Sequence, residues 1–500
     1  MFTNFEKLLR WKYLDCLILT FLFLIGFLLR IYLIDKNLFF GPEQGRDLLV
    51  VGDIVINHKL VLIGSKTDIE GIFHGPLYYY LATIPFLISK GNPLVIELFF
   101  ILLSALSIFL LYLLTKELFN RKIAMISSIL FTFSFGSIVM SRWLSNPPLT
   151  ILISCLFFLF LVKFLKGKNY YLVPVAICFG LASQAELVNF LIFSFILFFV
   201  VIIFWKRFIK QNILILIISF VVLLVTALVN FLLFDLRHQF LIINSFIKLL
   251  TKHSGYYGTL TESISNSANN FIHFFYESVI PFYSLPAILI FAFGVLSLIL
   301  LFNKNKIAVY LMLIWIFSPV IAFVILRYNP LYHYFAAVLI AFIILTSVLI
   351  DRIWSYKKML GIVFILFLVF VNLYAWAIYL PANKNVFFQS TQPDLKYSDQ
   401  KSVINEIYRE ANGSPFYFQS YTIPYWFQDG WEYLFWYFGT NVYGYVPENK
   451  NTKTLFVIIQ NDPGGKLYQE NWLTNTVSKW GTKENEFSHG ALKVQRLKAK

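Results

Sequence analysis

Long apolar runs constrain the fold of this chain more than any other feature of its sequence. A membrane-spanning helix needs about 20 apolar residues, with a range of roughly 17–25. The interval Tyr171–Phe204 is too long for one span and has basic flanks, so we expect two short spans that turn near Glu186. The other runs are Leu14–Ile34, Leu94–Leu114, Ile123–Met140, Leu149–Phe164, Ile213–Phe234, Leu285–Phe302, Ile307–Leu326, Tyr334–Ile350 and Leu360–Leu380. Together they predict an all-α polytopic membrane protein with about eleven transmembrane helices.

The composition excludes a soluble globular protein. Of the 500 residues, 59% are hydrophobic and 13% are charged, and the mean hydropathy is +0.71. The net charge of +15 comes from basic residues in short clusters between the apolar runs, as topology signals do. We therefore expect the lipid bilayer as a partner and no nucleic acid. Cys16, Cys155 and Cys178 all lie inside apolar runs, so no disulfide framework is available to the polar C-terminal part.

The basic clusters also predict the orientation of the chain. They fall on one side of the membrane only if the segment His74–Ser89 does not cross it, so we place this segment as a surface or re-entrant helix. The first run lacks a signal-peptide cleavage site and is predicted to be an uncleaved anchor. We thus expect a multi-pass protein of the plasma (inner) membrane with a cytoplasmic N-terminus. Its predicted parts are a transmembrane domain, residues 1–382, with a first outer loop at 35–93, and an extracytoplasmic domain, residues 383–500.

The polar C-terminal part has the pattern of a small α/β domain. An amphipathic helix is predicted over Lys401–Ala411, and strands are predicted over Pro415–Gln419, Leu455–Gln460 and Ala491–Leu497. The stretch Tyr421–Phe438 is dense in Trp, Tyr and Phe. We interpret this stretch as an aromatic belt that rests on the membrane face.

The predicted outer loops gather the polar residues that suit chemistry. In the first outer loop, Glu43 and Asp47 lie one helical turn apart, so the two carboxylates share a face, and Arg46 lies between them. A second piece of this loop begins at His74. The other outer loops add Arg142, Asn146, Asp235, Arg237, His238, Arg327, Tyr328 and Tyr332. We therefore expect a substrate site at the outer membrane interface.

These residue types suit the transfer of a sugar from a polyprenyl phosphate to a hydroxyl group. The acceptor hydroxyl needs a base to take its proton, normally a carboxylate, and Glu43 or Asp47 supplies one. The departing phosphate needs cations and hydrogen-bond donors, and Arg binds phosphate through its planar fork. Candidates for that role are His74, Arg142, Arg237, His238 and Arg327. The lipid tail of the donor would lie along a groove between apolar helices.

The sequence Pro42-Glu43-Gln44-Gly45-Arg46-Asp47 resembles the first-loop motif of the GT-C glycosyltransferases, in particular the protein O-mannosyltransferases and the lipid A aminoarabinose transferases. In that superfamily a carboxylate follows the first span, commonly Asp-Glu continued by Gly-Arg-Tyr, and Glu43 aligns with the leading Asp. His74-Gly75-Pro76-Leu77-Tyr78 is similar to the family's Lys-Pro-Pro-Leu-Tyr, whose Lys meets the donor phosphate. Ser141-Arg142 with Asn146, and Arg327-Tyr328 with Tyr332, resemble later loop elements.

The resemblance covers roughly residues 10–380 and implies the fold and the activity of the family. It implies a polyprenyl-phosphate sugar donor and a hydroxyl acceptor on a protein, a lipid or an envelope glycan, with inversion at the sugar. In this hypothesis Glu43 is the base and Asp47 orients the acceptor. The donor phosphate is held by Arg142, Arg237 and Arg327.

The chain also departs from the family's pattern. Gln44 replaces the family's Glu, and Asn146 stands where many relatives carry Asp. Because hard divalent cations prefer several carboxylates, we expect neither a metal nor another cofactor. The tail has Gln428-Asp429-Gly430-Trp431 and lacks the Trp-Trp-Asp motif of oligosaccharyltransferase catalytic subunits, so en bloc transfer of a glycan to Asn is not expected.

Two other functions stay open. A lipid-linked glycan flippase or transporter is expected to have charged residues inside its spans and broken helices at mid-membrane, whereas these spans are nearly charge-free. A catalytically inactive GT-C-like scaffold would explain Gln44 and Asn146. Glu186, at the turn between two short spans, is a further candidate because intramembrane carboxylates are rare and usually functional.

Overall fold

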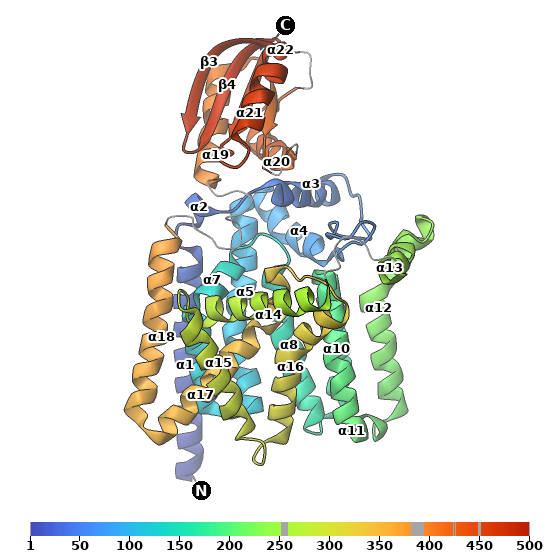
Figure 1. Cartoon of the computed structure of the whole chain (residues 1–500), viewed down its shortest axis with the longest axis vertical. Coiled ribbons are helices and arrows are strands. Elements are labelled where there is room, and N and C mark those ends of the chain that lie inside the picture. The colour runs from blue at the N-terminus through green and yellow to red at the C-terminus, as the bar shows by residue number, and fades with distance from the viewer. Residues whose placement is uncertain are drawn as a thin grey trace. The chain divides into compact units, whose positions relative to one another are not determined.

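The computed structural model describes residues 2–251, 259–381, 395–423, 425, 427–448 and 452–499 (Figure 1). By packing, the chain forms two compact units. Unit 1 comprises Met1–Tyr32, Val61–Tyr78 and Phe100–Ala377, and unit 2 comprises Leu33–Leu60, Tyr79–Phe99 and Ile378–Lys500. The predicted domain boundary between residues 382 and 383 lies outside the described residues and stays a prediction.

Unit 1 is built from helices, most of which coincide with the predicted apolar runs. The helices are α1 (Phe2–Ile31), most of α5 (Pro93–Leu118), α6 (Arg121–Phe133), α7 (Phe135–Ser141), α8 (Pro147–Leu165), α9 (Leu172–Ala185), α10 (Leu187–Ile203), α11 (Trp205–Ile209), α12 (Ile213–Arg237), α13 (Leu241–Thr251), α14 (Leu260–Val279), α15 (Ser284–Ile299), α16 (Lys306–Ile325), α17 (Leu339–Tyr356) and α18 (Lys358–Tyr379). The exceptions are Trp205–Ile209, Leu241–Thr251 and Leu260–Val279, and the last two form helices in a stretch that the sequence pattern indicated as a long outer loop. Short 3₁₀ helices span Asn169–Tyr171 and Tyr332–Val338.

Seven helices among the described residues are long and apolar enough to cross a membrane, or nine if each of two bent pairs is one span. The bent pairs are α6 with α7, at 61°, and α14 with α15, at 92°. In Figure 1, α14 accordingly crosses the upright α16. α9 and α10 meet at Glu186, where the sequence predicts a turn. The all-α membrane part is confirmed, while the count of eleven spans stays a prediction because α9 and α10 are shorter than a typical span.

The burial of each helix follows its apolar surface. Residues 339–350 of α17 are all buried, as expected of a helix that is apolar on every side. By contrast, only 11% of the apolar window of α12 is buried, and its Leu, Ile, Val and Phe side chains are largely exposed. Because exposed apolar surface of this extent is unfavourable in water, α12 has the surface of a lipid-facing helix.

The C-terminal part of unit 2 is the predicted small α/β domain. Its elements are α19 (Tyr397–Ala411), β1 (Tyr417–Tyr421), α20 (Asp429–Phe438), β2 (Thr454–Gln460), α21 (Lys466–Trp472), α22 (Ser478–Trp480), β3 (Gly481–His489) and β4 (Leu492–Ala499), with π-helical turns at Gly439–Tyr443 and Leu473–Val477. The strand order is β1-β2-β4-β3, with β1 and β2 parallel and the other pairs antiparallel. The predicted helix and the three predicted strands are therefore present, and β3 is a strand that the sequence pattern did not reveal.

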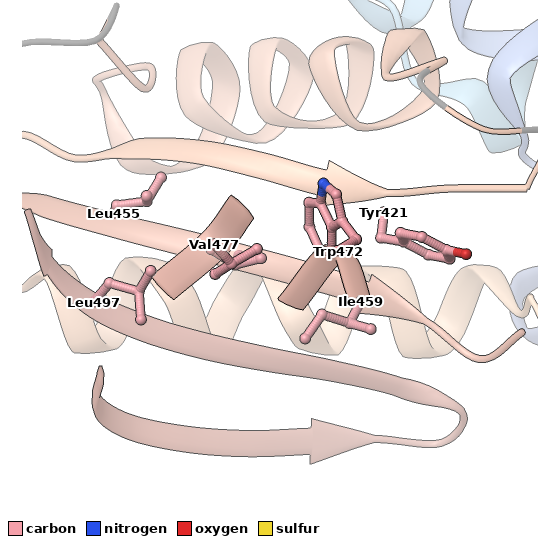
Figure 2. Packing of buried hydrophobic residues seen from close by; sticks show 7 residues of the cluster. Tyr421, Leu455, Ile459, Trp472, Val477 and Leu497 are labelled. Carbon is pink, nitrogen blue, oxygen red and sulfur yellow. The ribbon is translucent and has the colours of Figure 1, made fainter. Parts of the chain in front are cut away.

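The sheet buries apolar side chains on one face against α21 and the turn after it (Figure 2). The cluster consists of Tyr421, Leu455, Val457, Ile459, Trp472, Val477 and Leu497. Leu455, Val457 and Ile459 alternate along β2, as the two-residue period of a strand requires. α19 packs against β3 and β4. The sheet is thus held between helices.

The first outer loop contributes short helices to unit 2. α2 (Ile34–Asn37) and α3 (Pro42–Ile56) precede α4 (Leu77–Ser89), whose last eleven residues belong to unit 2. α4 has 13 residues, fewer than the about 20 that a span needs, which agrees with the prediction that it does not cross the membrane. α3 packs against α20. Trp431, Tyr433, Phe435 and Phe438 of α20 are buried, so the predicted aromatic belt is wrong for these four residues: they form protein contacts.

Candidate active site

The helix α3 carries both predicted carboxylates. It begins at Pro42, whose fixed φ suits the first helical position and whose missing N–H needs no partner there. The backbone N–H of Gly41 donates to the Gln44 Oε1 atom at 3.0 Å, which closes the first turn. Glu43 lies in this first turn, where the helix dipole favours a negative charge. Gln44, the departure from the family's Glu, therefore has a structural role as a cap.

Glu43 and Asp47 have very different surroundings. Glu43 is exposed, whereas Asp47 is only 3% exposed. The Asp47 Oδ1 atom accepts hydrogen bonds from the Arg46 Nε at 2.9 Å and from the Tyr79 hydroxyl at 3.0 Å. Burial raises the pKa of Asp47 to about 6, and Arg46 and Tyr79 oppose this rise by stabilising the carboxylate. Asp47 is thus a carboxylate poised to titrate close to neutral pH, and Arg46 is occupied in orienting it.

In unit 1, His74 lies on a loop that is folded back on itself. The His74 N–H donates to the Ser65 carbonyl oxygen and the Gly64 N–H donates to the His74 carbonyl oxygen, both at 2.8 Å. Gly75 follows where the loop meets the end of α9, and a Cβ atom there would lie 2.2 Å from the Gln184 Oε1 atom. Only glycine permits this approach, so Gly75 helps to fix where His74 lies.

The hydrogen bonding of His74 defines its tautomer. Because α10 begins at Leu187, the Leu187 N–H has no partner within its own helix. This N–H donates to the His74 Nδ1 atom at 3.2 Å. A ring nitrogen that accepts carries no proton, so neutral His74 has its proton on Nε2 and is a hydrogen-bond donor at that atom.

His74 lines a largely apolar cavity of about 180 Å³ within unit 1. Tyr328, a second predicted site residue, and Tyr334 line it too. The remaining wall is Thr67, Ile69, Ile72, Leu187, Val188, Leu191, Phe246, Phe323 and Leu326. An apolar cavity with a few polar groups is the usual form of a small-molecule or lipid site. The structure therefore brings His74 and Tyr328 together, as the loop assignment predicts.

A buried acid lies beside this cavity. Glu186, between α9 and α10, is 4% exposed, and its Oε1 atom is 3.7 Å from the His333 Nε2 atom. The His333 ring packs edge-on against Trp143, with 5.0 Å between the ring centroids. Burial raises the pKa of Glu186 to about 8, and the charge of Asp68 adds to the rise, while a hydrogen bond with Thr150 opposes it. Burial of Glu186 therefore favours its protonated form.

Arg142 and Asn146 lie at helix ends. The Arg142 Nη1 atom donates to the Arg30 and Tyr32 carbonyl oxygens at 2.7 and 2.8 Å, which satisfies the end of α1. Asn146 precedes α8 and is 8% exposed. Phosphate binding by Arg142 stays a prediction, and this helix-capping role competes with it.

The α12–α13 turn holds three predicted residues with separate roles. Buried Asp235 accepts hydrogen bonds from the Ile242 and Ile243 N–H groups at 2.8 and 3.0 Å, so it caps α13. Arg237 and His238 are exposed. The structure thus gives Asp235 a structural role and leaves Arg237 and His238 at the surface.

The last predicted loop places its residues on different surfaces. Arg327 is exposed and has a φ of 51°, in the left-handed region. The Tyr332 ring packs 5.0 Å from the His273 and Phe274 rings. Only Tyr328 of this loop's predicted residues lines the cavity.

The prediction of nearly charge-free spans missed Arg30. It lies inside α1 with no exposed surface, and it donates to the Gly26 carbonyl oxygen and the Ser137 Oγ atom at 2.9 Å each. A charged residue within an apolar run was the available signal, because such residues are costly unless they are satisfied. Glu186 was recognised from the same signal, but its His333 partner was not, since that pairing joins distant segments.

Within the described ranges, no three His, Cys, Asp or Glu side chains are grouped so as to hold a metal ion. The expected independence from metals stays a prediction.

Comparison with known proteins supports the resemblance seen in the sequence. Residues 73–231 match the family model described as dolichyl-phosphate-mannose-protein mannosyltransferase. No curated protein matches the chain.

Solved structures share the fold over nearly the whole chain. ArnT from Cupriavidus metallidurans in the apo state has a TM-score of 0.61 at 12% identity, covering 98% of both chains. The same protein bound to undecaprenyl phosphate has a TM-score of 0.59 at 12% identity, covering 97% of this chain and 98% of that one. The oligosaccharyltransferase of Archaeoglobus fulgidus in complex with Zn and sulfate reaches 0.51 at 16% identity, covering 95% of this chain and 72% of that one. The predicted resemblance to GT-C glycosyltransferases of the protein O-mannosyltransferase and ArnT type is therefore confirmed, and at these identities it is a likeness of fold.

Proposed function

We propose that this chain is a membrane glycosyltransferase that moves one sugar from a polyprenyl-phosphate donor to a hydroxyl group at the outer membrane face. The acceptor hydroxyl belongs to a protein, a lipid or an envelope glycan. The observation that carries the proposal is the pair of carboxylates on α3, one exposed and one buried and bound by Arg46 and Tyr79. The mannosyltransferase family match and the fold shared with ArnT, a protein solved with undecaprenyl phosphate, support it.

In the proposed reaction, Glu43 takes the proton of the acceptor hydroxyl. The acceptor oxygen forms a bond to the anomeric carbon while the bond from that carbon to the phosphate oxygen breaks. The phosphate leaves with the electron pair, and the sugar inverts because a single displacement occurs from the opposite face. Glu43 suits the base because its carboxylate is exposed and accessible to an acceptor hydroxyl. Asp47, held by Arg46 and Tyr79, orients the acceptor.

The cavity in unit 1 is the proposed site of the donor's lipid phosphate. Its Ile, Leu, Val and Phe side chains match the chemistry of an isoprenoid chain. His74 would donate from Nε2 to a phosphate oxygen, and Tyr328 provides a second polar group on the same wall. His74 stands where the family has Lys, so in the neutral form it would bind by hydrogen bonding rather than by a fixed charge.

The test is transfer of a radiolabelled sugar from a panel of polyprenyl-phosphate monosaccharides by the purified full-length protein, with and without a chelator. We expect transfer from at least one donor and no effect of the chelator. Donor binding without transfer would favour the lipid-linked glycan transporter or the inactive scaffold. Transfer abolished by the chelator would contradict the metal-independent mechanism.

A further inference from the structure

The backbone of α20 lies directly against the loop that carries Glu43. A Cβ atom on Gly45 would lie 2.3 Å from the Asp429 carbonyl oxygen and 2.4 Å from the Gly430 Cα atom. A Cβ atom on Gly430 would in turn lie 2.9 Å from the Gly41 carbonyl oxygen. These are contacts between backbones, and no side chain can move aside to relieve them. Gly45 lies two residues from Glu43 and two from Asp47, so this contact lies between the two carboxylates.

The helix α19 holds Phe40, which lies two residues before the start of α3. The Gln400 Nε2 atom donates to the Phe40 carbonyl oxygen at 2.9 Å, and Gln400 is 1% exposed. A carbonyl oxygen only accepts hydrogen bonds, which fixes the orientation of the Gln400 amide. The Phe40 ring has no exposed surface and packs against the Tyr397 and Tyr433 rings, with centroids 6.3 and 5.7 Å away. Phe40 is therefore held through both its backbone and its ring.

Further along α20, two aromatic side chains contact the later segment of the first outer loop, after Tyr78. The Tyr433 hydroxyl donates to the Gly91 carbonyl oxygen at 2.5 Å. The Trp436 ring stacks on the Phe86 ring, with 5.8 Å between centroids. α20 thus contacts both segments of the loop in unit 2, the one before Val61 and the one after Tyr78, and Asp47 and Tyr79 come from these two segments.

We propose that α19 and α20 of the C-terminal domain hold the two unit 2 segments of the first outer loop, residues 33–60 and 79–99, in their working geometry. In this proposal Gln400 is a positioning residue that presents Glu43 and Asp47 to the substrates. This inference rests on the proposed function of Glu43 and Asp47. It assigns the C-terminal domain a role in turnover, distinct from recognition of the acceptor. Gln400 touches neither carboxylate and acts through the Phe40 backbone and the start of α3.

Loss of the Gln400 hydrogen bond is expected to lower kcat, because a positioning residue acts on the geometry of the reacting groups. A displacement of about 1 Å at a reacting group lowers a rate by on the order of 100-fold. The cavity proposed for the donor is lined by residues of unit 1, whereas the Gln400 hydrogen bond to Phe40 lies within unit 2. Loss of the Gln400 bond is therefore expected to leave the KM for the donor unchanged.

The experiment compares Gln400→Met with Tyr408→Phe in the full-length protein. Gln400→Met keeps an unbranched side chain and removes the donor to the Phe40 carbonyl. Tyr408, on the same helix and 3% exposed, donates to the Tyr445 carbonyl oxygen at 2.9 Å, so Tyr408→Phe removes a matched bond within the C-terminal domain. Steady-state kinetics are measured with the donor that wild type uses, and hydrogen exchange is followed for the amides of residues 43–49.

Gln400→Met is expected to lower kcat by about 10- to 100-fold at an unchanged donor KM. The same variant is expected to speed exchange of the α3 amides about fivefold, which corresponds to the loss of one hydrogen bond. Tyr408→Phe is expected to change neither. Equal losses of kcat in both variants, or unchanged α3 exchange in Gln400→Met, would overturn the positioning role.

The exchange measurement also separates this inference from the proposed function. If Glu43→Gln turned over like wild type while Gln400→Met still loosened α3, the catalytic assignment would fail and the contact between the domain and the loop would stand. Gly45→Ala provides a second variant, because its Cβ atom must displace the backbone of Asp429. It is expected to give the kcat loss and the faster α3 exchange together, and wild-type values of both would overturn the inference.

Discussion

The Tyr79 hydroxyl donates a 3.0 Å hydrogen bond to the Oδ1 atom of Asp47. This bond joins two segments of the first outer loop that are 32 residues apart in the sequence. Asp47 also forms an ion pair with Arg46, with 2.8 Å between the Arg46 Nη2 and Asp47 Oδ1 atoms. Burial raises the pKa of Asp47 to about 6 although both partners stabilise the carboxylate, so the charge of Asp47 responds to modest changes in its surroundings.

Tyr79→Phe is expected to move the acidic limb of the pH–rate profile to higher pH. If the Asp47 carboxylate orients the acceptor, kcat/KM rises with pH through about 6. Removing the Tyr79 donor destabilises the charged form and raises the pKa of Asp47, by about 0.5–1 unit for one hydrogen bond. The control is Asp53→Asn, which removes another carboxylate of α3 and is expected to leave the limb in place. A limb that does not move in Tyr79→Phe would show that it reports another group.

Relative to wild type, Glu186→Gln is expected to become more stable as the pH rises. The pKa of Glu186 is about 8 in the folded protein and about 4.3 in an unfolded chain. Between these values the folded state binds more protons than the unfolded state, so the free energy of unfolding of wild type falls with rising pH and levels off above about 8. Gln does not titrate, so the stability of the variant relative to wild type grows across this window.

Thermal unfolding at pH 5 and pH 8.5 measures this difference. Relative to wild type, Glu186→Gln is expected to gain about 2–4 °C between the two pH values. Glu470→Gln removes an exposed carboxylate and is expected to show no such gain. A Glu186→Gln protein that follows wild type at both pH values would mean that Glu186 is ionised in the folded state.

Two substitutions of His74 separate its two nitrogen atoms. His74→Ala removes both the acceptor for the Leu187 N–H and the Nε2–H donor. His74→Asn removes the Nε2–H donor but keeps an acceptor near the Nδ1 position. Both variants are expected to raise the KM for the donor by about 10-fold or more, the size of one hydrogen bond to a charged phosphate. Only His74→Ala is expected to lose thermal stability, since it leaves the Leu187 N–H without its partner. A donor KM equal to wild type in both variants would contradict the assignment of His74 to the donor site.

Local sequence patterns were sufficient for the long apolar helices and for most of the C-terminal sheet, but not for α13 and α14, which lie between two apolar runs. The apolar runs are long enough to define helices on their own, and the turn at Glu186 followed from the length of Tyr171–Phe204. β2 was recognisable because Leu455–Gln460 is a buried apolar strand. β3 was not, because it is an edge strand whose residues 482–485 are exposed and mostly polar, so it lacks the periodicity of a buried strand.

For the candidate site, the sequence predicted the chemically active residues but not the residues that contact them. Glu43, Asp47 and His74 could be named from the first outer loop, since carboxylates and a His beside a membrane span are unusual. The partners of these residues could not, because Tyr79, Leu187 and the α20 backbone reach them only through tertiary packing. The aromatic content of α20 was interpreted as a membrane belt for the same reason: composition alone does not distinguish burial in protein from contact with lipid.

Sugar transfer by Glu43→Gln beside wild type tests the central claim most directly. Glu43 is exposed, so the substitution is expected to leave the free energy of unfolding within about 0.5 kcal/mol of wild type. Donor binding is expected to persist, while kcat falls by about 10²–10⁴-fold because the acceptor hydroxyl loses its base. Turnover equal to wild type in the folded variant would contradict the assignment of Glu43 as the catalytic base.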